Sequence, residues 1–166
     1  AIADASYREF DKLVEPGTVP PTAPLKTGSN ASLLGWRELG RAGREFISSG
    51  PTSDDISAFS SRRALEPVRV YVGLRSADTL DVRAKLALEE LKRVGGFERS
   101  VLIVITPTGT GWVDPSALDS VEYLHGLSLG AKHSEQSTDL IEVLNDPFAG
   151  ALWSGPPYSS RLWRFF

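Results

Sequence analysis

The chain has 166 residues, no cysteine and a formal net charge of −3 at pH 7. This length predicts a single domain with a real core. The lack of cysteine excludes disulfides, thiol catalysis and cysteine-based zinc sites. Two histidines are too few for a histidine metal cluster, so only carboxylate metal sites stay open, and we expect no metal and no cofactor. The modest charge gives no electrostatic basis for binding nucleic acid.

Residues 1–66 are predicted to form an arm and helices that pack on a core formed by residues 67–166. Apolar residues at helical spacing predict a short helix over residues 7–14. Four prolines within residues 15–31 predict an extended arm on the surface. Residues 32–49 are predicted to be partly helical, although each of their three glycines costs about 1 kcal/mol relative to alanine.

Residues 68–74 (VRVYVGL) are rich in β-branched and aromatic side chains, which predicts a strand. A helix is predicted over residues 76–94, with Ser76 as its N-cap and Gly95-Gly96 ending it. Val101–Ile105 is a continuous apolar run, typical of a parallel strand buried on both faces. Strand, helix and strand in succession predict an α/β fold with a small, mostly parallel sheet and flanking helices.

Asp114-Pro115 is a strong helix start, so a helix is predicted from there through Val121. A second helix is predicted over residues 129–144, with Leu140, Ile141 and Leu144 as its apolar face. A short strand is predicted over residues 149–154. The apolar segment 162–166 (LWRFF) is expected to be an exposed end that docks on a partner or on a second copy of the chain, giving a homo-oligomer.

Gly126-Leu127-Ser128-Leu129-Gly130 fits the pattern G-x-S-x-G. In this pattern a serine nucleophile stands on a sharp turn between a strand and a helix, and the glycines let the two backbones approach. Ser128 is therefore the candidate nucleophile, and the N–H of Leu129 is a candidate oxyanion-hole donor.

The turn Thr108-Gly109-Thr110 follows a predicted strand and is placed to supply a second oxyanion-hole donor. An ordinary connection between a strand and a helix is the alternative for this turn. A phosphate cradle is a third and less favoured interpretation, because neither the P-loop nor the dinucleotide glycine spacing is met.

A nucleophilic serine needs an acid and a histidine base, which follow it in the chain in this architecture. Residues 147–166 contain no Asp, Glu or His. His125 lies on the segment before the serine, and His133 lies on the predicted helix after it. The later carboxylates are Glu135, Asp139, Glu142 and Asp146. All of these fit solvated side chains better than a triad, so weak or no turnover is expected.

Several stretches resemble an actinobacterial α/β-hydrolase family in which an N-terminal membrane-spanning domain precedes a C-terminal hydrolase domain. The most distinctive are GTGWVDP (109–115), GLSLGA (126–131) and ALWSGPP (151–157). The resemblance implies an esterase- or lipase-like serine hydrolase that uses Ser128 on a small-molecule or lipid-like acyl substrate. Because no run of residues here is long enough to span a bilayer, membrane attachment is expected only through a domain absent from this chain.

One departure from the family pattern concerns Tyr123-Leu124-His125-Gly126. The family has two separate segments that resemble DSVEYLHG and YLHGLSLG, and here these four residues serve as part of both, as in an internal deletion. If residues 121–125 form a strand, Ser128 can be presented on a turn; if they form a helix, it is an ordinary loop serine. The Asp114-Pro115 start favours the helix. The alternative function is a non-catalytic structural or interaction module derived from the hydrolase fold.

Overall fold

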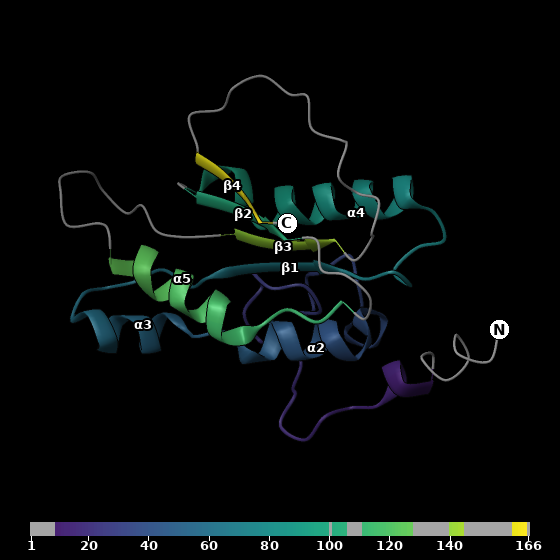
Figure 1. The fold of residues 1–166 in the computed structure, drawn as a ribbon, viewed down its shortest axis with the longest axis horizontal. Helices are drawn as coiled ribbons and strands as arrows, with labels where there is room; N and C mark the ends of the chain where they lie inside the picture. Colours follow the sequence, from purple (N-terminus) through teal and green to yellow (C-terminus); the bar gives the residue numbers. More distant parts are fainter. Residues whose placement is uncertain (1–8, 100, 106–110, 128–139, 145–160, 166) are drawn as a thin grey trace.

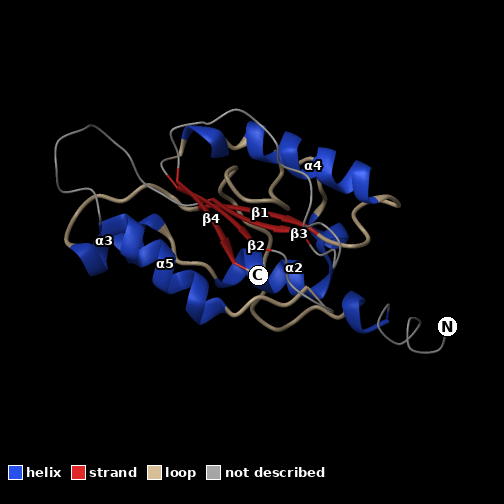
Figure 2. Cartoon of the chain, turned by 45° about the horizontal axis from the view of Figure 1, so that its top comes forward, coloured by secondary structure: helices blue, strands red, loops and turns tan. Residues whose placement is uncertain are grey.

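The computed structural model describes residues 9–99, 101–105, 111–127, 140–144 and 161–165. The elements in chain order are η1 (Trp36–Leu39), α2 (Gly40–Ser49), α3 (Ser53–Ser60), β1 (Val68–Val72), α4 (Leu80–Arg93), η2 (Gly96–Glu98), β2 (Val101–Ile105), α5 (Pro115–Leu127), β3 (Leu140–Leu144) and β4 (Arg161–Phe165). Helix α4 covers one face of the sheet, and α2, α3 and α5 lie on the other (Figure 1 and Figure 2). These layers confirm the predicted α/β class.

The four described strands form one sheet in the order β1-β3-β2-β4, and all its pairs are parallel. Strand β3 lies between β1 and β2, so that Glu142 pairs with Val70 on one side and with Val104 on the other. The first two strands of the chain, β1 and β2, are therefore not paired with each other, because β3 lies between them. The carboxyl ends of all four strands meet at one edge of the sheet.

The first strand and the helix after it lie close to where the sequence predicts them. Helix α4 starts four residues later than expected, because the hydroxyl of Thr79 accepts the N–H of Val82 (3.3 Å) and caps it. Ser76, the predicted N-cap, instead accepts the N–H of Gly73 (3.0 Å) in the turn after β1. Gly95 ends the helix as predicted, with a left-handed φ of 68°.

The helix predicted over residues 129–144 is wrong over its last five residues, which form strand β3. This segment (LIEVL) is short and apolar, and periodicity alone does not separate a buried strand from a helix at that length. Strands on both sides satisfy its backbone groups, which makes a parallel strand the stable solution. Residues 129–139 and the strand predicted over 149–154 lie outside the described residues.

Strand β4 (Arg161–Phe165) includes most of the segment 162–166 that the sequence predicts to be an exposed end. It pairs with β2 in parallel register, with Ile103 opposite Trp163. The strand satisfies the ladder groups of β2 that would otherwise remain open at the edge of the sheet. Docking of this segment on a second copy of the chain stays a prediction.

The N-terminal arm is not confined to the surface, because its last part joins the edge of the sheet. Lys26 and Thr27 are 6% and 0% exposed. Thr27 donates its N–H to the carbonyl of Arg69 (3.0 Å), and its hydroxyl accepts the N–H of Tyr71 (3.2 Å). Burial of these residues follows from strand-like pairing with β1. Before the arm, residues 9–12 are helical, whereas residues 13 and 14, the end of the helix predicted over 7–14, are not. Residues 7 and 8 lie outside the described residues.

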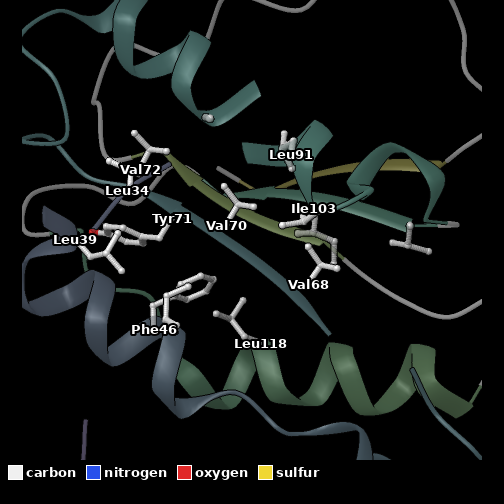
Figure 3. Packing of buried hydrophobic residues seen from close by; sticks show 14 residues of the cluster. Leu34, Leu39, Phe46, Val68, Val70, Tyr71, Val72, Leu91, Ile103 and Leu118 are labelled. Atoms are coloured by element: carbon white, nitrogen blue, oxygen red, sulfur yellow. The ribbon is translucent and has the colours of Figure 1, made fainter. Parts of the chain in front are cut away.

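One hydrophobic cluster connects the helices to β1 (Figure 3). Every residue of β1 is buried, as expected for a strand covered on both faces. Phe46 of α2 and Tyr71 of β1 pack with ring centroids 5.8 Å apart. Leu118 of α5 joins them on this side, and Leu91 of α4 packs on the cluster from the other face. Strand β1 therefore packs against helices on both faces of the sheet.

Gly43 of α2 tests this packing. A Cβ at Gly43 would lie 2.5 Å from the ring of Tyr71, which is 2% exposed and has no free space to move into. Alanine gains about 1 kcal/mol of helix propensity, whereas overpacking at so short a separation costs about 2–3 kcal/mol, the upper part of its usual range. We expect Gly43→Ala to lower the free energy of unfolding in urea by about 1–2 kcal/mol.

Gly35→Ala is the matched control, because a Cβ there meets only the end of the Glu38 side chain at 3.4 Å. Its φ of −69° suits alanine. We expect a change within about 0.5 kcal/mol. Equal stability of the two variants would contradict the tight contact at Gly43.

Candidate functional site

The segment before the candidate nucleophile is a helix and not a strand. Helix α5 runs from Pro115 to Leu127, so the first two residues of the G-x-S-x-G pentapeptide belong to it. The carboxylate of Asp114 accepts the N–H of Ser116 (3.0 Å) and stabilises the start that the sequence predicts. The preference for a helix over residues 121–125 is thereby confirmed. The strand that would lead into a nucleophile elbow is not formed by these residues.

Helix α5 runs antiparallel to β1 (Figure 1). Tyr71, near the carboxyl end of β1, donates its hydroxyl to the carbonyl of Gly111 (3.4 Å), just before the helix begins. Arg69, near the amino end of β1, contacts Asp119 and Glu122 farther along the helix. The helix therefore ends on the side of the amino ends of the strands.

The predicted site residues Ser128, Leu129, Thr108, Gly109 and Thr110 all lie outside the described residues. Their neighbours in the chain are described. Residue 110 precedes Gly111, near the start of α5, and residue 128 follows Leu127, where α5 ends. The first and last residues of this helix are about 18 Å apart at 1.5 Å per residue. The two halves of the predicted site are thus attached at opposite ends of one helix.

His125 is the one histidine that the structure describes. It lies on α5, where burial lowers its pKa, so the imidazole is neutral at pH 7. The sequence predicts Glu142 on a helix after the serine. In the structure it lies in the middle of strand β3. Among the described residues, no three His, Asp or Glu side chains gather in a way that could hold a metal ion.

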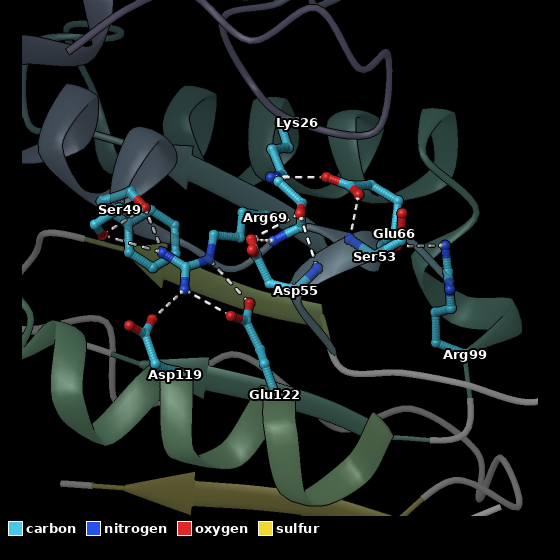
Figure 4. A network of polar contacts seen from close by, with 11 residues as sticks. Lys26, Ser49, Ser53, Asp55, Glu66, Arg69, Arg99, Asp119 and Glu122 are labelled. Carbon is cyan, nitrogen blue, oxygen red and sulfur yellow. Dashed lines mark hydrogen bonds and ion pairs between the residues drawn. The ribbon is translucent and has the colours of Figure 1, made fainter. Parts of the chain in front are cut away.

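The described residues contain one buried ionic cluster that sequence reasoning missed (Figure 4). Arg69 and Glu122 are both fully buried. Arg69 donates from Nε and Nη2 to the two carboxylate oxygens of Glu122, at 2.9 and 2.7 Å. Its Nη2 also reaches Asp119 (3.1 Å), and its Nη1 donates to the carbonyl of Phe46 (2.5 Å). One guanidinium therefore connects β1, α2 and α5.

The electrostatics of this cluster are those of an ion pair, Arg69 with Glu122, that has a structural role. Burial raises the pKa of Glu122, although the hydrogen bonds from Arg69 act in the opposite direction. A bidentate arginine–carboxylate pair is the arrangement that can offset such desolvation. The signal in the sequence was Arg69 within the apolar run VRVYV, together with Glu122 four residues after Leu118, a spacing that places both on one face if the predicted helix continues past Val121.

A second ion pair lies beside this cluster (Figure 4). Lys26 of the arm pairs with Glu66 at 2.9 Å, and Glu66 also accepts the N–H of Ser53 (2.8 Å) at the start of α3. Arg99 donates to the carbonyl of Glu66 (3.4 Å). Each of these partners is satisfied within the fold, so the contacts anchor the arm and α3 and leave no group aimed at a ligand.

Helices on both faces of a parallel sheet define an α/β domain. Comparison with known families then identifies the family to which this domain belongs. A family model described as "Alpha/beta-hydrolase family" matches residues 68–126 and 123–166, and that of the "Alpha/beta-hydrolase family N-terminus" matches residues 1–51. The chain belongs to this α/β-hydrolase family. No curated protein and no solved structure matches it.

The two matched segments of the hydrolase model overlap at residues 123–126. This overlap agrees with the expectation that YLHG joins two separate parts of the family pattern. The structure gives these residues one conformation, the end of α5. Within the described ranges, no helix combines the length and apolar character that a membrane span requires.

Loss of the charge on Glu122 tests the buried cluster. Glu122→Gln keeps the shape of the side chain but leaves the buried Arg69 guanidinium without its bidentate partner, which costs about 3 kcal/mol or more. Asp119→Asn is the control, because Asp119 is 33% exposed, and such a pair contributes at most about 1 kcal/mol. Urea unfolding of the two variants measures both losses.

The double variant Arg69→Met/Glu122→Leu leaves no buried charge unpaired, because Asp119, which loses its partner, is 33% exposed. We therefore expect it to be more stable than Glu122→Gln. A Glu122→Gln variant as stable as Asp119→Asn would contradict the structural importance of the pair.

Proposed function

We propose that this chain is a serine hydrolase-like domain that carries out acyl chemistry through Ser128, on an ester or related substrate of small-molecule or lipid-like kind. Ser128 attacks the carbonyl carbon, the C–O bond to the alcohol breaks, and the alcohol leaves with the serine proton. Water then hydrolyses the acyl-enzyme to the acid and restores the serine. The N–H groups of Leu129 and of residues 108–110 stabilise the oxyanion that develops on the carbonyl oxygen. No metal or cofactor is needed for this chemistry.

Family membership carries the proposal. The second matched segment, 123–166, includes the whole G-x-S-x-G pentapeptide, and the first, 68–126, includes the glycine turn after β2. The candidate nucleophile and the candidate oxyanion-hole segment are therefore both within the matched segments. A lone pentapeptide would be weaker support, since G-x-S-x-G is a short motif.

Turnover by this chain is expected to be weak or absent. The residues before Ser128 form the end of α5, whereas a nucleophile elbow requires a strand that leads into the serine. This helix is also the observation that favours the alternative, a non-catalytic structural or interaction module built on the hydrolase fold.

A fluorophosphonate probe separates the two functions, because it labels only a serine whose nucleophilicity is raised by its surroundings. If Ser128 is activated, the intact chain is labelled covalently, and Ser128→Ala abolishes the label. Intact-protein mass spectrometry measures the labelled fraction.

Ser120→Ala is the matched control, since Ser120 is an exposed serine on α5 whose hydroxyl donates to the carbonyl of Ser116 (2.7 Å). We expect this variant to label like the parent chain. Absence of label on the parent chain would reject the enzyme proposal in favour of the non-catalytic module.

A further inference from the structure

The sequence contains two pairs of adjacent basic residues, and the structure places them in opposite environments. The first pair, Arg62-Arg63, lies in the connection between α3 and β1 (Figure 1). Both residues are exposed, and neither belongs to a helix or a strand. Within the described part of the chain, no hydrogen bond or ion pair holds either guanidinium group. Two adjacent positive charges are therefore presented to solvent on an irregular segment.

The second pair, Lys92-Arg93, is held within the fold. It ends helix α4, so its backbone is helical. Arg93 donates from Nε to the carboxylate of Glu90 (2.7 Å) and from Nη1 to the carbonyl of Pro24 (2.6 Å). A protein that binds two adjacent basic residues in an extended conformation can therefore reach this pair only by unwinding a helix.

The backbone beside the exposed pair is held by few contacts. Ser61 ends α3 with a left-handed φ of 54°, a conformation that is strained for a residue with a side chain. Ala64 is 8% exposed, and its N–H donates to the hydroxyl of Ser57 (2.9 Å). One hydrogen bond to a side chain thus anchors the residue that follows the pair. Loop segments without helix or strand pairing open at low cost and are the preferred places for proteolytic cleavage.

We propose that Arg62-Arg63 is a processing site for an endopeptidase that recognises paired basic residues, and that cleavage divides the chain into residues 1–63 and 64–166. Arginine side chains suit such recognition, because a guanidinium group binds a carboxylate in a pocket through two hydrogen bonds. Water supplies the hydroxyl of the new carboxyl group at Arg63 and the proton of the new amino group at Ala64, as the C–N bond between them breaks. The site does not depend on Ser128.

The contacts between the two pieces do not pass through the cleaved segment. Arg69 donates to the carbonyl of Phe46, and the ring of Phe46 packs on Tyr71 with centroids 5.8 Å apart. Lys26 pairs with Glu66 at 2.9 Å. Cleavage breaks one covalent bond and none of these contacts, so the two pieces remain together as one noncovalent complex. The cut also falls between the segment that matches the N-terminal family model and the segments that match the hydrolase model.

The test treats the full chain, under native conditions, with a purified endopeptidase of the kexin type, which cleaves after paired basic residues. We expect two products, residues 1–63 and 64–166, identified by intact-protein mass spectrometry and eluting together in gel filtration. Cleavage after Arg93 at an equal rate, or no cleavage, would overturn the proposed site. Separation of the two products in gel filtration would overturn the proposed complex. In protein isolated from its source cells, we expect a fragment that begins with Ala64, and its absence would overturn the processing role.

Three variants test whether the local structure controls the cleavage. Arg62→Gln/Arg63→Gln should abolish it. Ser57→Ala removes the acceptor of the Ala64 N–H and should speed cleavage about fivefold, because cleavage follows the population of the open segment. Ser120→Ala is the matched control, since its hydroxyl bond lies on α5, and it should be cleaved at the rate of the parent chain. Equal rates for Ser57→Ala and Ser120→Ala would contradict opening at Ala64.

Discussion

The buried ion pair of Arg69 and Glu122 determines how helices α2 and α5 are positioned on the sheet. Both side chains are fully excluded from solvent, and a lone charge in that position would cost several kcal/mol. The pair therefore forms only when α5 lies along β1 with Glu122 opposite Arg69. The remaining donors of the guanidinium reach the carbonyl of Phe46 and the carboxylate of Asp119. The position of α2 and the direction of α5 follow from this one group.

The same constraint shapes the functional interpretation. Asp119 and Glu122 are three residues apart, a spacing that places both on one face of a helix. Their joint contact with Arg69 thus stabilises the helical state of the segment that would have to be a strand in a nucleophile elbow. Residues 123–126, which two segments of the family match share, continue this helix to Leu127. Membership of the α/β-hydrolase family is therefore compatible with the weak or absent turnover that we propose for this chain.

The edge of the sheet at the carboxyl ends of the strands is covered by contacts of a different kind. The carboxyl end of β1 is covered by an arm held through Asp11, Glu15 and three arginines, with its apolar side chains left exposed. The core is rigid where Phe46, Tyr71 and Leu118 interlock, whereas this edge is assembled from contacts that salt screens.

The sequence by itself determined the α/β class, the strand Val101–Ile105, the helix start at Asp114-Pro115 and the family, because these depend on local periodicity, caps and motif spacing. It also supplied the candidate nucleophile Ser128, whose position lies outside the described residues. Only the tertiary structure decided that Leu140–Leu144 is a strand, since its neighbours β1 and β2 provide the backbone partners that a short apolar segment lacks. The burial of Arg69 with Glu122 was likewise decided by long-range packing, because the cost of a buried charge is offset only by a partner 53 residues away in the chain.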